Sequence, residues 1–379
     1  MSAEPSEIRR AVLVTAREHL TEVVEELRGF ASLGFDTESN GFYAHRERVC
    51  LVQISSLETD YILDPIAVRD ISSLGSILAD PGVEKIFHAA EYDLIGLKRD
   101  YNFEVRGIFD TMVAGKFLGW KELGLAKAIE KHFGVALSKK LQRADWARRP
   151  LTDEHLRYAQ MDTHYLIELS RIQRGLLIER GRWEDAQEAF ADLEEVAVPH
   201  KEFNPEGYWS LSGSRDLSGQ QRAVLREVYL LREAEAARRD QAPFRVMSED
   251  FMVRLAVESP RDRAGFARVK GASPYILERL GEKLLAAVRR GLSAPPALQE
   301  PPRPERARRN MRQERAFEKL RQWRKQAAEQ EQLDPGAILS ATVLQEMARR
   351  SAAGEDPLEI LSPVKRRRYA ESLRRLLEQ

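Results

Sequence analysis

The chain has 379 residues, too many for one ordinary domain, and its 43% hydrophobic content excludes general disorder. Its 60 Lys and Arg residues balance 60 Asp and Glu residues, which excludes a global polycation. The single cysteine, Cys50, excludes an internal disulfide and a zinc cage built from cysteines.

The first apolar segment in chain order, AVLV at 11–14, is too short for the apolar region of a signal peptide, and charges surround it. No apolar run approaches the ~20 residues of a membrane span. A single cysteine suits a reducing compartment. We therefore expect a soluble, cytoplasmic protein that has no membrane partner.

Strand-like and helix-like segments alternate as far as about residue 125, which predicts an α/β sheet domain. The strand-like segments are SLGFDTES (32–39), VCLVQISS (49–56), YILD (61–64) and KIFHA (85–89). Helical spacing occurs in RDISSLGSIL and EYDLIGLKRDY. From Thr152 to Arg180 the pattern predicts one long helix, since Pro150 bars an earlier start.

The C-terminal half reads as helices separated by linkers. We interpret GYWSLSGS (207–214) as a polar linker and SAPPALQEPPRPE (293–305) as a proline-rich spacer. The stretch 231–256 aligns without a gap on 323–348. In both copies a proline turn (Pro243, Pro335) follows a helix, and a serine (Ser248, Ser340) is placed to cap the next one. This pattern predicts a duplicated helical module.

Two carboxylates, Asp36 and Glu38, flank Thr37 on the first long strand. Side chains alternate faces along a strand, so both carboxylates face one way, while Leu33 and Phe35 face the other. The pair repels itself unless a cation lies between, and hard oxygen ligands suit Mg²⁺ or Mn²⁺. Taken alone, the pair is more typical of a strand end that reaches solvent.

Three further signals are weak singly. Asp93 follows a strand and falls in the first turn of a predicted helix, where the helix dipole also favours a carboxylate. Tyr158 and Asp162 stand four residues apart and share a helix face. Asp110 precedes a helical pattern, so a helix cap is its predicted role. We interpret Gln53 as a sheet residue without a further role.

The ordered set, a DxE on a first strand, an Asp at a later helix start and a YxxxD on a late helix, resembles the DEDDy exonuclease superfamily, and ribonuclease D closely. VCLVQIS, FHAAEYDL, LSKKLQRADWARRPL and YAQMDTHYLIEL are similar to that family. The repeated helical segments resemble HRDC modules. The resemblance implies a ribonuclease H-like mixed sheet with flanking helices over 1–205, followed by two all-α HRDC-like domains, 214–292 and a divergent 304–379.

The resemblance also implies an activity, a 3′→5′ exoribonuclease that uses a two-metal-ion mechanism and releases nucleoside 5′-monophosphates. It implies that two Mg²⁺ or Mn²⁺ ions are held by Asp36, Glu38, Asp93 and Asp162, with Tyr158 orienting the attacking water. RNA is the implied partner, in particular tRNA precursors with 3′ extensions, and protein contact remains an alternative role for the helical modules. A DNA 3′→5′ exonuclease and a non-catalytic nucleic-acid-binding protein on the same fold remain alternatives.

Substrate contacts are predicted outside the carboxylates. His88 ends a strand and is placed to bind a substrate oxygen, although a structural histidine is common there. Lys139, Gln142 and Trp146 belong to a basic stretch with an aromatic, a pattern typical of phosphate contact and base stacking. The cluster at 303–315 and KRRR at 365–368 are predicted to contact RNA backbone, in a segment with 18 Lys and Arg against 13 Asp and Glu from residue 300 onward.

Overall fold

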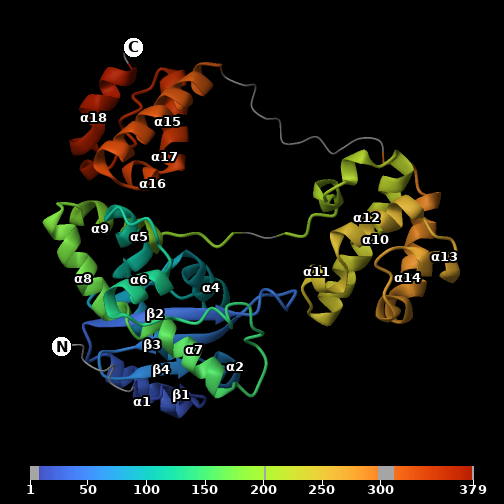
Figure 1. The fold of residues 1–379 in the computed structure, drawn as a ribbon, viewed down its shortest axis with the longest axis horizontal. Coiled ribbons are helices and arrows are strands. Elements are labelled where there is room, and N and C mark those ends of the chain that lie inside the picture. The colour runs from blue at the N-terminus through green and yellow to red at the C-terminus, as the bar shows by residue number, and fades with distance from the viewer. Residues whose placement is uncertain (1–7, 200–201, 298–310, 378–379) are drawn as a thin grey trace. The chain divides into compact units, whose positions relative to one another are not determined.

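The computed structural model describes residues 8–199, 202–297 and 311–377. They form two compact units (Figure 1). The first unit contains residues 8–39, 49–199 and 311–377, and the second contains 40–48 and 202–297. Each unit buries its own apolar core, so each is described separately below.

The first unit is built on a six-stranded mixed sheet with the strand order β1-β4-β3-β2-β5-β6. The strands are β1 (Val12–Val14), β2 (Ser32–Ser39), β3 (Val49–Ser55), β4 (Asp60–Leu63), β5 (Glu84–Phe87) and β6 (Ile108–Asp110). Strand β2 pairs antiparallel with β3 and parallel with β5. The mixed sheet that the resemblance implied is therefore confirmed.

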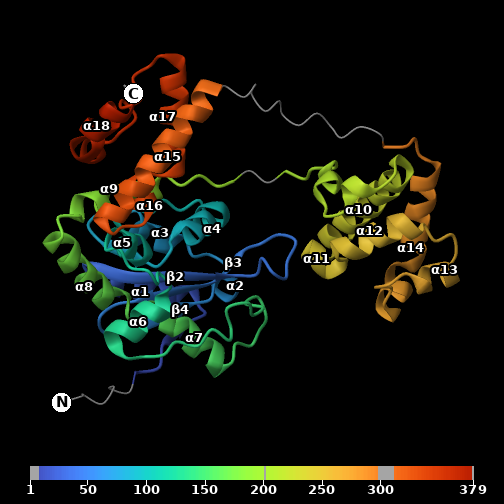
Figure 2. The same cartoon turned by 45° about the horizontal axis from the view of Figure 1, so that its top comes forward.

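Strand β2 separates an apolar face from a polar one. Leu33 and Phe35 are fully buried in the core that also receives α1 (Arg17–Leu27) and α4 (Glu91–Tyr101). The opposite face of the sheet carries α7 (Asp153–Thr163), which lies along β3 and β4 (Figures 1 and 2). Asp36 and Glu38 alternate with the apolar residues and face α7, as the strand pattern predicted.

The predicted long helix over 152–180 is wrong in one respect, because the chain turns at His164 and Tyr165. Two helices result, α7 and α8 (Leu166–Glu179). Thr152 caps α7 as predicted, since its side chain accepts a hydrogen bond from the backbone N–H of His155. The other elements of this part are α2 (Pro65–Val68), η1 (Ser72–Leu74), α3 (Gly75–Leu78), α5 (Thr111–Phe117), α6 (Leu125–Phe133) and α9 (Trp183–Glu194).

The second unit is helical. Its elements are η2 (Gly207–Ser210), η3 (Ser214–Asp216), α10 (Gly219–Arg239), α11 (Pro243–Val246), α12 (Glu249–Glu258), α13 (Arg263–Arg268) and α14 (Pro274–Ser293). The interpretation of 207–214 as a polar linker is wrong. Tyr208 and Trp209 are buried in the helical core, and the Ser214 hydroxyl donates to the carbonyl of Trp209. Burial of the aromatic side chains of Tyr208 and Trp209 stabilises this segment in the core, although its neighbouring residues are polar.

The C-terminal helices are α15 (Met311–Glu331), α16 (Pro335–Ile338), α17 (Ala341–Ala353) and α18 (Pro363–Leu377). They repeat the local pattern of the second unit. Pro243 begins α11 and Pro335 begins α16. Ser248 accepts from the Phe251 N–H at the start of α12, and Ser340 accepts from the Val343 N–H at the start of α17. The predicted proline turns and capping serines are thus both present.

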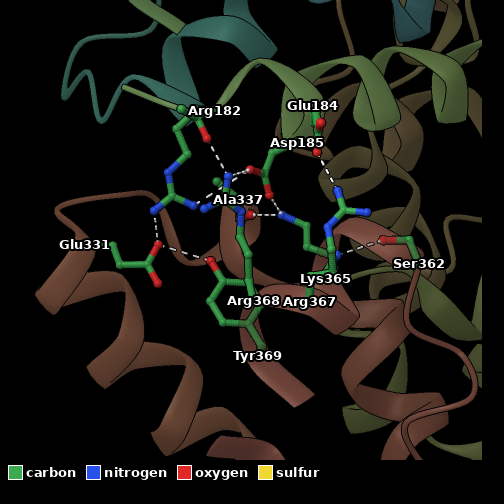
Figure 3. A network of polar contacts seen from close by, with 11 residues as sticks. Arg182, Glu184, Asp185, Glu331, Ala337, Ser362, Lys365, Arg367, Arg368 and Tyr369 are labelled. Carbon is green, nitrogen blue, oxygen red and sulfur yellow. Dashed lines mark hydrogen bonds and ion pairs between the residues drawn. The ribbon is translucent and has the colours of Figure 1, made fainter. Parts of the chain in front are cut away.

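The basic residues of α18 dock that helix onto α9 (Figure 3). The carboxylate of Asp185 is fully buried, and it lies 3.0 Å from Lys365 Nζ and 2.7 Å from an Arg368 guanidinium nitrogen. Lys365 Nζ also donates to the carbonyl of Ala337 at 2.6 Å. Arg367 pairs with Glu184 on the surface. Buried charges require partners, so this network holds the C-terminal helices against the sheet-containing part.

Lys365 and Arg368 bind the buried Asp185 carboxylate within the chain, which contradicts the prediction that these two residues bind RNA backbone. Arg367 is exposed in its ion pair with Glu184, so RNA contact remains a prediction for that residue. Residues 303–310 of the other predicted cluster lie outside the described residues. None of the described helices combines the length and the apolar character needed to cross a membrane.

Candidate active site

Helix α7 approaches strand β2 very closely at Gly34. A Cβ atom at this position would lie 2.9 Å from the carbonyl oxygen of Thr163, so a larger residue would push the helix away. The hydroxyl oxygens of Ser55 on β3 and Thr163 are 2.7 Å apart, which fixes the same end of the helix. Asp162, the neighbour of Thr163, is thereby brought to the polar face of β2.

Three carboxylates converge at this point. Ligand oxygens of Asp36, Glu38 and Asp162 all lie within 4.8 Å of one another, and the three residues are partly buried. Carboxylate oxygens at such spacing suit a hard divalent cation. In chemistry and spacing the donor set fits a metal such as Mg²⁺ or Mn²⁺.

Asp93 reaches the same region from α4, on the other side of β2. Its Oδ1 accepts hydrogen bonds from the backbone N–H of Thr37 at 2.9 Å and from the Thr37 hydroxyl at 2.6 Å. Thr37 lies between Asp36 and Glu38, so the carboxylate is tied to the strand segment that carries them. The charge of Asp93 acts on Asp36, Glu38 and Asp162, although its oxygens are outside the group of three.

The four carboxylates resist ionisation in the absence of a cation. Burial, and then repulsion from the neighbouring carboxylates, raises the pKa of Glu38 to about 9 and that of Asp162 to about 7. Burial also raises the pKa of Asp93 to about 7, against the hydrogen bonds from Thr37, and places the pKa of Asp36 well above its ordinary value. A divalent cation would supply the positive charge that these groups lack.

Tyr158 lies one helical turn before Asp162. Burial raises the pKa of its phenol, and the charges of Asp162, Glu38 and Asp36 act in the same direction, so the hydroxyl stays protonated at neutral pH. The hydroxyl group is therefore available as a hydrogen-bond donor beside the carboxylates. Its ring packs against Trp146, with ring centroids 5.8 Å apart.

The prediction that Trp146 stacks a substrate base is wrong, because the side chain is 1% exposed. Its indole packs between Tyr158 and His155. The loop behind it is fixed by Arg149, whose guanidinium pairs with both carboxylate oxygens of Asp64 at 2.6 and 2.7 Å. The Trp146 indole, predicted to stack on a substrate base, instead packs against the Tyr158 ring.

Lys139 and Gln142, the other two residues predicted in this loop, are exposed. They follow α6 in an irregular segment that ends before α7. Their side chains are accessible to a ligand, so substrate contact remains a prediction for both.

His88 lies at the end of β5 with its imidazole partly buried. The Thr111 hydroxyl donates to the Phe87 carbonyl at 3.0 Å and lies 2.9 Å from His88 Nδ1. The Thr111 hydroxyl donates its proton to Phe87, so it can only accept from His88. This pattern assigns the imidazole proton to Nδ1 and leaves Nε2 as an acceptor. Burial lowers the pKa of His88, while the charge of Asp110 opposes this shift.

Asp110 has the predicted capping role and a second one. Its carboxylate accepts from the N–H groups of Met112 and Val113 at the start of α5. It also accepts from Ala89 at 3.2 Å and Ala90 at 2.8 Å, just before α4. Ala89 has a φ of +63°, a conformation that costs energy for a non-glycine residue. Asp110 thus fixes the turn that connects His88 to the helix carrying Asp93.

The sequence interpretation missed a buried anchor at Asp60. Its carboxylate accepts from Gln160 Nε2 at 2.6 Å and from the Ser55 hydroxyl at 2.6 Å, and it lies 2.8 Å from His164 Nδ1. Gln160 precedes Asp162 on α7, and His164 directly follows the helix. No local spacing signals this contact, because the partners are about a hundred residues apart in the chain.

Comparison with known proteins agrees with this architecture. Residues 11–174 match the family model described as 3′-5′ exonuclease, and residues 221–288 and 313–378 each match the HRDC domain. The crystal structure of the catalytic core of RRP6 from Trypanosoma brucei has a TM-score of 0.68 and 28% sequence identity, and the match covers 75% of this chain and 80% of that chain.

The chain is similar in sequence to relatives of two kinds. The exosome complex component 10 homolog of Caenorhabditis elegans is 30% identical over 278 residues, which cover 72% of this chain but 32% of that protein. The chain thus spans about a third of the length of such relatives. Ribonuclease D of Gluconacetobacter diazotrophicus is 30% identical over 280 residues, which cover 73% of this chain and 71% of that protein. The chain therefore belongs to the ribonuclease D family.

Proposed function

We propose that this protein is a 3′→5′ exoribonuclease, which hydrolyses RNA from its 3′ end and releases nucleoside 5′-monophosphates. The observation that carries the proposal is the convergence of Asp36, Glu38 and Asp162 within 4.8 Å of one another on an exonuclease fold. Relatives named ribonuclease D and exosome complex component 10 support the choice of RNA over DNA.

The roles of the site residues follow from their geometry. We assign Asp36, Glu38, Asp93 and Asp162 as the residues that hold two divalent metal ions, Mg²⁺ or Mn²⁺. Such ions, when bound, lower the pKa of water and offset the negative charge of the phosphodiester. The Tyr158 hydroxyl donates a hydrogen bond that orients the attacking water. We assign it this orienting role because burial raises the pKa of Tyr158, which favours the protonated phenol.

We assign substrate contacts to His88, Lys139 and Gln142. His88 Nε2 is an acceptor and is suited to a hydroxyl of the terminal ribose. Lys139 and Gln142 are exposed on the loop before α7 and are suited to phosphate contact. An acceptor that receives the 2′-OH would favour RNA, because DNA has no such donor.

The natural substrate that we propose is a tRNA precursor with a 3′ extension, processed in the cytoplasm. The proposed domain boundaries remain 1–205 for the exonuclease, 214–292 for the first HRDC domain and 304–379 for the second. We assign RNA guidance to the helical domains, which match the HRDC model twice.

The test is incubation of the full chain with a 3′-tailed tRNA and with a single-stranded DNA of matched length, with Mg²⁺ or with EDTA. We expect mononucleotide release from the RNA, faster than from the DNA and abolished by EDTA. Asp36→Ala and Asp162→Ala should abolish release while the circular dichroism spectrum stays unchanged. Preferential cleavage of DNA would replace the proposal with a deoxyribonuclease, and turnover by either variant would refute the site assignment.

A further inference from the structure

Gln53, in the middle of β3, is a buried amide without a protein partner. Its side chain is fully buried, and neither Nε2 nor Oε1 has a hydrogen-bond partner among the residues that the structure describes. Leaving a buried polar group unpaired costs about 1–3 kcal/mol, so such groups are rare and usually have a cause. A purely structural position in this strand would favour an apolar residue.

The sheet register places Gln53 beside the carboxylates. Gln53 is the direct cross-strand partner of Asp36 on β2, and Ile62 is its partner on β4. Residues directly opposite each other in an antiparallel pair share a face, with Cβ atoms about 4.5–5.5 Å apart. The polar lateral neighbour of the Gln53 amide is therefore Asp36.

The helix above this face brings a second carboxylate. Leu51 and Ser55 flank Gln53 on the same face of β3. Leu51 belongs to the same buried cluster as Ala159, and Ser55 contacts Thr163. Gln53 thus faces the turn of α7 between Ala159 and Thr163, and this turn carries Asp162. The register therefore places the unpaired amide between the apolar cluster of Leu51, Ile62 and Ala159 and the Asp36 carboxylate.

We propose that Gln53 is a positioning residue of the metal site, whose amide N–H orients the Asp36 carboxylate when a divalent cation is bound. The inference rests on the proposed function. A neutral amide suits this place because it donates a hydrogen bond without adding a further negative charge to four carboxylates. Its carbonyl oxygen can accept from a water molecule in the same site. Hydrogen bonds of this kind fix the geometry of metal ligands.

The test is calorimetric titration of Mn²⁺ into the full-length chain without RNA, for the natural protein and for Gln53→Met. We expect the variant to bind Mn²⁺ about 10-fold more weakly, the lower end of what lost ligand support costs. The thermal midpoint in EDTA should stay the same or rise, because methionine fills the space without unpaired groups. If Gln53→Met does not fold, Gln53→Asn serves instead, since it retains an amide that is one methylene too short.

Gln173→Met is the matched control. Gln173 is also fully buried in the first unit, and its Nε2 donates to the carbonyl of Thr111. This variant should lower the thermal midpoint and leave Mn²⁺ affinity unchanged. Natural affinity in Gln53→Met, with affinity lost in Asp36→Ala, would overturn the role of Gln53 and leave the proposed function intact. Absence of Mn²⁺ binding by the natural protein would overturn both.

Discussion

Tyr158 combines two physical tasks at the candidate site. Its hydroxyl lies near carboxylates whose charges raise its pKa, and its ring packs on the buried Trp146. A substitution that keeps the ring and removes the hydroxyl separates these tasks. The Tyr158→Phe variant therefore isolates the contribution of the phenol to hydrolysis.

We expect Tyr158→Phe to slow RNA hydrolysis about 10²-fold, because the attacking water loses a positioned hydrogen-bond donor. Mn²⁺ affinity and the thermal midpoint should be unchanged, since the carboxylates and the packing on Trp146 remain. Single-turnover assays with excess enzyme measure the effect on hydrolysis itself. Hydrolysis by this variant at the rate of the natural protein would show that the Tyr158 hydroxyl does not contribute to the reaction.

The raised carboxylate pKa values predict how stability depends on pH without metal. Asp93 and Asp162, with pKa values of about 7, and Glu38, with a pKa of about 9, bind protons more tightly when folded than when unfolded. The associated stability is complete below pH 4 and is lost as the pH rises through 7 and 9. In EDTA, the thermal midpoint should fall between pH 6 and 9, and less steeply in Glu38→Gln. A midpoint that rises over this range in EDTA would contradict the assigned electrostatics.

The candidate carboxylates could be chosen from the sequence only as an ordered set that resembles the DEDDy exonucleases, because each local signature is weak alone. Asp36 and Glu38 alternate on a strand, and Tyr158 and Asp162 share a helix face. Gln53 belongs to no such set, because its proposed role depends on Asp36, its neighbour across the sheet. Trp146 was misjudged because an aromatic among cations looks exposed, whereas here it is buried.

At the scale of elements, α7 is held to the sheet by polar contacts around Asp60 as well as by apolar packing. Gln160, His164 and Ser55 all contact the Asp60 carboxylate. Burial acts to raise the pKa of Asp60, but its hydrogen bonds with His164, Ser55 and Gln160 outweigh burial and lower the pKa overall. The ionised form is therefore the one that the fold stabilises.

We expect Asp60→Ala to lower the free energy of unfolding by about 2–3 kcal/mol, because it leaves buried donors unpaired. Hydrolysis should fall as well, since α7 carries Asp162 and Tyr158. Urea unfolding at pH 7 measures the stability change. Glu130→Ala is the control, because Glu130 forms an exposed ion pair with Lys127, and such a pair contributes less than about 1 kcal/mol. Equal losses in the two variants would argue against the anchor.

Element boundaries show what local sequence can and cannot predict. The Thr152 cap and the paired proline and serine positions were predictable, because caps and proline turns depend on neighbouring residues. The turn at His164 and Tyr165 was not, because helical residues continue through it. It coincides with the contact between His164 and Asp60, which lies far away in the chain.

For the whole molecule, the C-terminal helices belong to the same compact unit as the sheet. Asp185 connects them, since it is fully buried and contacts both Lys365 and Arg368. Beside this contact the partly buried Arg182 pairs with Glu331, which also accepts from the Tyr369 hydroxyl at 3.1 Å (Figure 3). This docking could not be predicted from a run of four basic residues, because its partner lies 180 residues earlier.

We expect Asp185→Ala to destabilise the first unit by about 3 kcal/mol, because it leaves the partly buried Lys365 and Arg368 without their buried counter-charge. It should also make the segment from Met311 onward more sensitive to limited proteolysis. Glu184→Ala is the matched control. That residue pairs with Arg367 on the surface, so its loss should change stability by less than about 1 kcal/mol. Identical digestion patterns for Asp185→Ala and the natural chain would show that the docking does not depend on Asp185.

The proline that opens the last helix of each repeated module allows the two modules to be compared at their final helices. Lys365 lies two residues after Pro363, the first residue of α18. The corresponding residue of α14, two residues after Pro274, is Ile276. An isoleucine at the position of Lys365 would place an aliphatic side chain, without a positive charge, against the buried Asp185 carboxylate. The two copies are therefore not interchangeable, and a chimera carrying the first module in the second position would lose its attachment to the nuclease.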